Sequence, residues 1–232
     1  MTSIVDNFVT IEPQEASALL AFFTSQHPSD MTDKALIDAD QELIRQKTER
    51  TRAAWRKICP PLYDQTDASR IPAAILDEVM PIDMGAGRGL FIYGKPGTFK
   101  TRATWLKLAY EFTRNHRSVC YLTPHDFALS ASASMGARDA NNEYGGGWWI
   151  SRMIHQPDIL FLDDAFKNRI TEAQEFALFA IIEGRMNACK ATCITSNKSI
   201  DAIPELFTGN GAKMRADALT RRIGESCEVL AV

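Results

Sequence analysis

One short stretch near the middle of the chain constrains its fold more than any other. Residues Gly94 to Thr101, GKPGTFKT, match the phosphate-binding loop pattern G-x-x-x-x-G-K-[ST] at every defined position except Phe99. The apolar run Leu90 to Tyr93 predicts a buried strand before the loop, and residues 102–109 after it have a helical period. A strand, a loop and a helix in this order are the context in which such a loop binds phosphate.

The loop supplies the groups that bind a nucleoside triphosphate. Its backbone N–H groups and the helix N-terminus surround the phosphates, Lys100 is expected to reach the outer phosphates, and the Thr101 hydroxyl is expected to ligate Mg²⁺. ATP with Mg²⁺ is therefore the expected ligand. The expected nucleotide-binding residues are Gly94, Lys95, Pro96, Gly97, Thr98, Phe99, Lys100 and Thr101.

A second motif follows where an apolar segment ends in two carboxylates. Residues Asp158 to Asp164, DILFLDD, have the form of a Walker B strand, which places both acids at the carboxyl edge of a sheet, where open α/β sheets bind ligands. Asp163 is expected to hold Mg²⁺, directly or through water, and Asp164 to orient or deprotonate the attacking water. Taken alone, the pair also fits a solvated turn or a helix cap.

A third predicted strand, Ala191 to Asn197, is apolar and β-branched and ends in polar residues. Asn197 is expected to lie beside the γ-phosphate as a polar sensor. The alternative is an ordinary turn asparagine. The order of the three motifs along the chain favours the sensor.

Together these residues resemble the DnaC-type replicative helicase loaders and the related IstB transposition helper ATPases of the AAA+ class. The resemblance covers roughly residues 60–232 and implies a P-loop AAA+ (RecA-like) parallel sheet flanked by helices. It also implies an ATP-dependent switch that assembles head to tail with copies of itself, binds single-stranded DNA, and delivers a replicative helicase or a transposase to it. The segments that carry it are Gly94 to Thr101, Leu160 to Asp164, Thr171 to Arg185, Ile194 to Asn197 and Arg221 to Ile223.

A predicted helix from Met214 to Gly224 carries three arginines. Its simplest interpretation is a solvated basic face. The resemblance implies instead that Arg222 reaches the nucleotide of an adjacent subunit as an arginine finger, with Arg221 and Arg215 as alternatives. Residues 226–232 predict one more strand, and no C-terminal helical lid is expected.

Phe99 departs from the family, which has Gly at this position. A loop position of this kind favours positive φ, where a residue with a Cβ costs on the order of 1–2 kcal/mol. The ring is expected to point outward, over the base or over a neighbouring helix. Asp164 is a second departure, because a Glu is commoner there, but the resembled family tolerates it, so Phe99 is the residue that leaves hydrolysis open.

Composition sets the remaining bounds. With 232 residues and 45% hydrophobic content, the chain can form one large α/β domain, 60–232, and one small helical region, 1–59, which is expected to bind a partner. The formal net charge is -3, so DNA contact requires a local patch or several subunits in line. Five cysteines without a C-x-x-C spacing, and no membrane-length apolar run, predict a soluble cytoplasmic protein without membrane contact.

Two further regions are less specific. A short helix near residues 18–23 and a longer one at about 33–58, basic in its second half, predict either a partner-binding arm or an ordinary solvated face. Residues 138–147 predict a loop. After this loop, Trp148, Trp149 and Arg152 either face single-stranded DNA or, for at least one tryptophan, belong to the core.

Two classes of function follow. The first is an ATP-driven assembly protein that loads a helicase, with a transposition helper as its nearest alternative. The second is a nucleotide-binding scaffold that has lost hydrolysis through Phe99. A metabolic kinase fits the loop but accounts less well for the Asp pair, the strand-terminal Asn and the late arginines.

Overall fold

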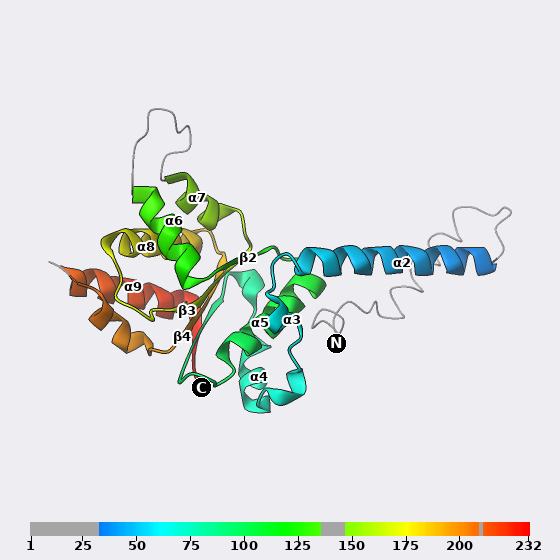
Figure 1. Ribbon diagram of the computed structural model, residues 1–232, viewed down its shortest axis with the longest axis horizontal. Coiled ribbons are helices and arrows are strands. Elements are labelled where there is room, and N and C mark those ends of the chain that lie inside the picture. The colour runs from blue at the N-terminus through cyan, green and yellow to red at the C-terminus, as the bar shows by residue number, and fades with distance from the viewer. Residues whose placement is uncertain (1–32, 136–146, 209–210) are drawn as a thin grey trace. The chain divides into compact units, whose positions relative to one another are not determined.

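The computed structural model describes residues 33–135, 147–208 and 211–232 (Figure 1). The chain divides into two compact units, Met1–Thr66 and Asp67–Val232. The short helix expected near residues 18–23, and most of the loop expected at 138–147, lie outside the described residues. No helix in the described part of the chain is long and apolar enough to cross a membrane.

Within the first unit, the structure describes helices α2 (Asp33–Trp55) and α3 (Pro61–Asp64). Helix α2 ends before residue 58, the expected end, because the following amides of Lys57 and Ile58 bond to carbonyls only three residues back. Pro61 then starts α3, since proline suits the first turn of a helix. Residues 39–54 of α2 are mostly exposed, including Leu43.

The second unit is built on one parallel sheet with strand order β2-β3-β4-β1-β5. The predicted parallel sheet flanked by helices is thereby confirmed. Because β4 lies between β1 and β3, the ends of the three strands that carry the sequence motifs are neighbours. The strands are β1 (Gly89–Tyr93), β2 (Val119–Leu122), β3 (Ile159–Ala165), β4 (Ala191–Ser196) and β5 (Cys227–Ala231).

Helices cover both faces of the sheet. Helices α4 and α5 lie on one side, and α6 to α9 lie on the other (Figure 1). The first face is packed by Trp105, whose ring centroid lies 5.3 Å from that of Phe161; the second is a larger core that includes Leu160, Ile181 and Ile194. The helices are α4 (Ala73–Val79), α5 (Lys100–Arg114), α6 (Pro124–Met135), α7 (Gly147–His155), α8 (Glu172–Asn187) and α9 (Ala212–Ser226), with short 3₁₀ turns η2 (Ala68–Arg70), η3 (Met84–Ala86) and η4 (Ile200–Leu206).

Helix α8 supplies a buried cation at the amino-terminal ends of β3 and β4. The Arg185 side chain is fully buried, and burial lowers its pKa to about 10. Its guanidinium bonds to backbone carbonyls at the end of α7 and at the starts of β3 and β4, an arrangement that distributes a buried charge over peptide dipoles. The acceptors are Met153 O (2.8 Å), Pro157 O (3.0 Å), Asp158 O (3.0 Å), Ala191 O (2.6 Å) and Thr192 Oγ1 (3.1 Å).

We expect Arg185→Met to lower the free energy of unfolding by about 3 kcal/mol or more, because it leaves several buried carbonyls without a donor. Chemical denaturation followed by circular dichroism measures the change. Arg221→Met is the matched control, since the Arg221 side chain is 66% exposed and its removal should alter stability by less than about 0.5 kcal/mol. Equal stability of the two variants would contradict the assigned role of Arg185.

Candidate nucleotide-binding site

The loop after β1 turns at two glycines, for different reasons. Gly97 has a φ of 85°, which glycine adopts without strain, and a Cβ there would meet nothing within 4 Å. At Gly94, a Cβ would lie 1.8 Å from the Val232 carbonyl oxygen, so only glycine fits. The Gly94 N–H donates to Ser196 O at 3.2 Å, which fixes the start of the loop on β4.

Phe99 is the last residue of the loop and the N-cap of α5. Its φ of 64° and ψ of 6° are left-handed, as the sequence predicts for this position. It makes no side-chain cap hydrogen bond to the helix. The backbone therefore has the turn that a phosphate-binding loop needs, although the residue that makes it carries a Cβ.

Lys100 folds back over the loop. It is only 7% exposed, and its Nζ donates to the carbonyl oxygens of Gly94 and Lys95, both at 2.8 Å. Burial lowers the pKa of Lys100, while the Asp164 and Asp163 carboxylates oppose that shift. The ammonium is thus held at the loop by neutral carbonyls, which an anionic ligand can replace as acceptors.

The buried carboxylate of Asp163 joins three elements of the site. Its Oδ1 accepts hydrogen bonds from Thr101 Oγ1 on α5 at 2.8 Å and from Thr195 Oγ1 on β4 at 2.6 Å. Burial raises the pKa of Asp163, and the two hydroxyl hydrogen bonds oppose the shift. Thr101 and Asp163, the residues expected to hold Mg²⁺, are therefore in direct contact.

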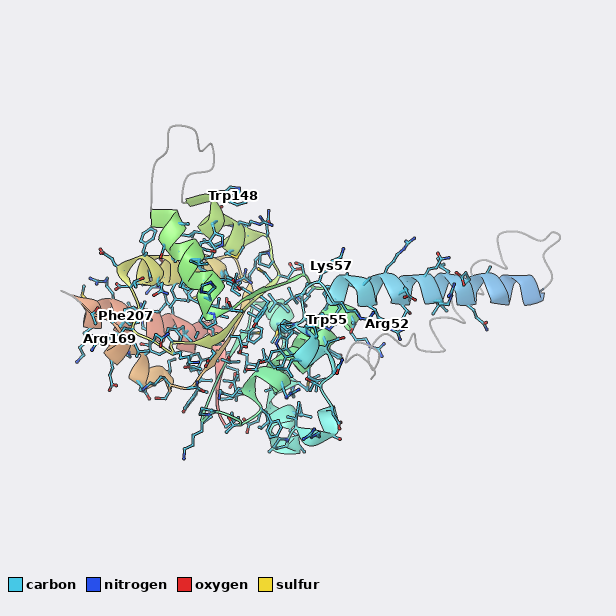
Figure 2. All side chains as sticks on the ribbon, in the orientation of Figure 1. Arg52, Trp55, Lys57, Trp148, Arg169 and Phe207 are labelled. Carbon is cyan, nitrogen blue, oxygen red and sulfur yellow. The ribbon has the colours of Figure 1, made fainter. Side chains whose placement is uncertain are left out.

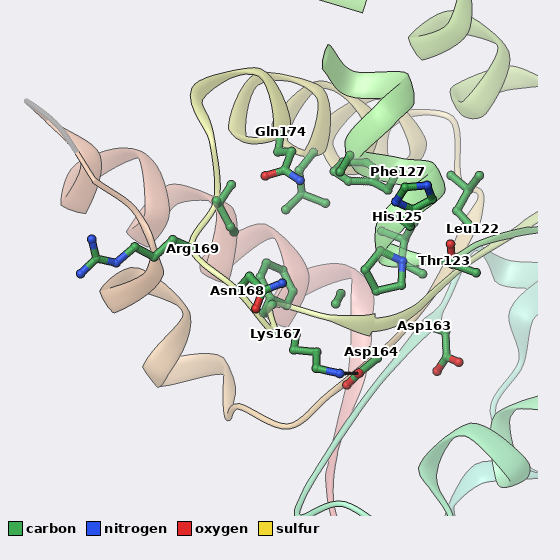
Figure 3. Close-up of a pocket in the computed structure, with 17 residues that line it drawn as sticks. Leu122, Thr123, His125, Phe127, Asp163, Asp164, Lys167, Asn168, Arg169 and Gln174 are labelled. Atoms are coloured by element: carbon green, nitrogen blue, oxygen red, sulfur yellow. Dashed lines mark ion pairs between the residues drawn. The ribbon is translucent and has the colours of Figure 1, made fainter. Parts of the chain in front are cut away.

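Asp164 has a left-handed backbone, with a φ of 48°. Its Oδ1 accepts from Asn197 Nδ2 at 2.8 Å, and its Oδ2 lies 3.4 Å from Lys167 Nζ. Figure 3 shows this ion pair at the edge of a cavity of about 560 Å³ between β2, α6 and the β3–α8 connection. The residues expected as water activator and polar sensor are thus hydrogen-bonded to each other.

Thr195 is a site residue that the sequence analysis did not single out. Its hydroxyl donates to Asp163 and also accepts from the Asp164 backbone N–H at 2.7 Å. Thr195 is almost fully buried, on a strand whose neighbour ends in the two acids. A hydroxyl at the buried end of a strand beside a Walker B segment was the available signal.

Comparisons with known proteins rest on structure alone. No protein-family model and no curated protein sequence matches the chain. The DnaC helicase loader matches with a TM-score of 0.52 and 22% identity, over 74% of this chain and 94% of that one. A putative primosome component from Streptococcus pyogenes serotype M3 matches with 0.54 and 20%, over 75% and 89%. The replication initiator DnaA, bound to AMPPCP and single-stranded DNA, matches with 0.51 and 18%, over 72% and 47%.

The chain therefore has the same fold as the DnaC helicase loader, an AAA+ type of parallel sheet flanked by helices. On this AAA+ fold, the residues present fit Mg-ATP. The loop has space at Gly97, α5 begins at its end, and the Thr101 hydroxyl lies beside the Asp163 carboxylate, so that two oxygen ligands of the kind that Mg²⁺ prefers are adjacent.

The AAA+ fold does not bring Arg222 to the loop of its own chain. Its Nη2 donates to Glu183 Oε1 of α8 at 2.7 Å, and its guanidinium lies 4.6 Å from the Phe179 ring centroid. The side chain is 17% exposed, and its Nε is buried without a partner in the described structure. Of the two alternatives, Arg221 is exposed, and Arg215 is paired with Glu175.

The two adjacent tryptophans of α7 have different surroundings. Trp149 is half-buried, with its ring centroid 5.9 Å from that of Phe127 on α6. Trp148 is 45% exposed at the start of α7 (Figure 2), and the Arg152 guanidinium lies 5.2 Å from its ring centroid. Trp149 is therefore the one packed on the domain, and Trp148 offers an aromatic face with a cation beside it.

We expect Thr195→Val to destabilise the protein by about 2 kcal/mol, because it leaves the partly buried Asp164 N–H without an acceptor and the buried Asp163 with one donor fewer. Thr195→Ser, which keeps the hydroxyl, should restore most of the loss. Thermal and urea unfolding of both variants measure the difference. A serine variant that is destabilised as much as the valine variant would contradict the role assigned to the Thr195 hydroxyl.

Proposed function

We propose that the protein is an ATP-dependent DNA replication protein of the helicase-loader type. In this role it binds ATP with Mg²⁺ and single-stranded DNA, assembles head to tail, and delivers a replicative helicase to DNA. The observation that carries the proposal is the contact of Thr101, Asp163 and Thr195 beside the hydrogen-bonded pair of Asp164 and Asn197. This arrangement combines a phosphate-binding loop with the acids that nucleotide hydrolysis needs.

Each residue has a role that follows from its place. Lys100 moves its hydrogen bonds from the loop carbonyls to phosphate oxygens, and Thr101 with Asp163 holds the cation. Asp164 accepts the proton of the attacking water, and Asn197 orients Asp164. When bound, Mg-ATP supplies the phosphoanhydride that is cleaved and a cation that neutralises developing charge.

Nucleic acid and protein partners are supported by surface features. The exposed Trp148 ring beside Arg152 combines a base-stacking face with a cation, the pair of groups with which proteins hold single strands. One structural neighbour, DnaA, was solved with single-stranded DNA bound. The exposed helix α2, basic in its second half, is the candidate arm for a helicase; an IstB-like transposition helper would use the same site with a transposase instead.

A nucleotide-binding scaffold without hydrolysis is the second candidate, and two observations favour it. Phe99 holds a strained left-handed turn in the loop. Both carboxylate oxygens of Asp164 are already engaged, by Asn197 and by Lys167, so a water must compete for them. Turnover decides between the two candidates.

We expect the wild-type chain to turn over Mg-ATP faster with single-stranded DNA than without it, and Lys100→Ala, which lacks the phosphate-binding ammonium, to show no turnover above background. Asp164→Asn should still bind ATP but lose about 10²- to 10⁴-fold in turnover, because an amide cannot accept the proton. Phosphate release and equilibrium nucleotide binding measure these effects. ATP binding without turnover by the wild-type chain would favour the scaffold, and absence of binding would refute both candidates.

We expect Arg222→Ala to be inactive alone but to regain turnover when mixed with Lys100→Ala subunits. In such a mixture, Arg222 of a Lys100→Ala subunit can act on the intact loop of an Arg222→Ala subunit. An arginine finger of this kind contributes about 10³- to 10⁵-fold to the turnover rate. Phosphate release over a range of mixing ratios measures the complementation. Arg221→Ala, which removes the exposed arginine beside it, is measured in parallel, since complementation by Arg221→Ala in place of Arg222→Ala would assign the finger to Arg221. No recovery at any ratio would argue against a finger supplied between subunits.

A further inference from the structure

A cavity of about 420 Å³ lies beside the phosphate-binding loop, within the range of small-molecule pockets. It is formed by three segments that are far apart in the sequence: the region of α4, the end of the loop, and the end of β5. Its walls are mainly apolar, with a single ionisable side chain among them, Glu78. The lining residues are Pro72, Ala74, Ile75, Glu78, Gly97, Thr98, Phe99, Ala231 and Val232.

Phe99 belongs both to the loop and to this cavity. Its backbone has the left-handed turn of the loop, at a φ of 64°, while its half-buried side chain lines the cavity. Within the described residues, no other aromatic ring contacts the Phe99 ring. A bulky residue in this conformation is uncommon, and such strain persists where the surroundings or the function require it.

The cavity begins where the phosphate groups of a ligand would end. The N–H groups of Gly97, Thr98 and Phe99 belong to the segment that leads into the N-terminus of α5, which favours anions. The same three residues form one wall of the cavity. A ligand whose phosphates lie on the loop therefore has an apolar cavity, with an aromatic ring in its wall, directly beside its remaining part.

We propose that the Phe99 ring stacks on the base of the bound nucleotide and is a determinant of nucleotide affinity in this protein. The inference rests on the proposed nucleotide binding and assigns a role to the one loop residue that departs from the phosphate-binding pattern. Pro72 and Ile75, which also line the cavity, add apolar surface for the base. Because stacking uses the π-face that every base has, ATP and GTP should bind with similar affinity.

The test compares two ligands, because strain in the loop and contact with the base must be separated. Mg-ATP has phosphates and a base, whereas inorganic tripolyphosphate with Mg²⁺ has phosphates alone. A change in loop conformation alters both affinities, but loss of stacking alters only the first. The quantity to measure is the affinity ratio, defined as the dissociation constant for tripolyphosphate divided by that for ATP, by isothermal titration calorimetry, for the wild type and for each variant.

We expect Phe99→Leu, which keeps the Cβ and an apolar side chain but removes the ring, to lower this affinity ratio about tenfold. Phe99→Tyr should leave the ratio unchanged. Phe99→Gly, which restores the pattern residue and relieves the positive φ, should fold at least as well as the wild type and still lower the ratio. Phe176→Leu is the matched control, because it removes a 57% exposed ring from α8 and should change neither affinity.

The outcomes separate the two levels of the proposal. If the wild type binds neither ATP nor tripolyphosphate, the proposed function fails and the inference with it. If the wild type binds ATP but Phe99→Leu and Phe99→Gly keep its affinity ratio, nucleotide binding stands and stacking on Phe99 is refuted. A ratio that falls in both variants while tripolyphosphate affinity is retained establishes the contact, since a merely structural role would change both ligands together.

Discussion

The candidate site depends on one buried carboxylate oxygen, Asp163 Oδ1, which accepts hydrogen bonds from hydroxyls on two other elements. Strand β3 carries the acid, α5 carries Thr101 and β4 carries Thr195. Burial opposes the charge of Asp163, and the two hydroxyls compensate for part of that cost. A ligand that binds the Thr101 hydroxyl must therefore share or displace its hydrogen bond to Asp163. Such a change at the loop alters the contacts of β3 and β4 directly.

A second polar group, Arg185, holds the opposite ends of the same strands. Its guanidinium bonds to carbonyls at the start of β3 and at the start of β4, while Asp163 and Thr195 meet near their carboxyl ends. A parallel pair fixed at both ends cannot slide in register, because a shift would separate donors from acceptors at both points. The register that brings Thr195 of β4 to Asp163 of β3 is thus fixed near both ends of the strands.

The sequence predicted the features that are encoded locally. The loop and the strand with its two acids follow from patterns within a few residues, and the parallel sheet follows from the family that these motifs resemble. The contact of Thr195 with Asp163 and that of Arg222 with Glu183 were missed, because these residues lie 32 and 39 positions apart in the sequence. Whether Trp148 or Trp149 faces the core depends on how α7 lies against α6, which the sequence of α7 does not specify.

The contacts of Arg222 have a consequence for how an assembly of this protein would behave over time. In a lone protomer, the arginine contacts Glu183 and Phe179, and its Nε has no hydrogen-bond partner among the described residues. In the proposed assembly, a neighbouring subunit would recruit Arg222 only after these contacts are exchanged, so completion of the site would be a step separate from the encounter of subunits. Dilute protomers of such a protein would not turn over ATP, and turnover would begin with a delay after the subunits assemble on DNA.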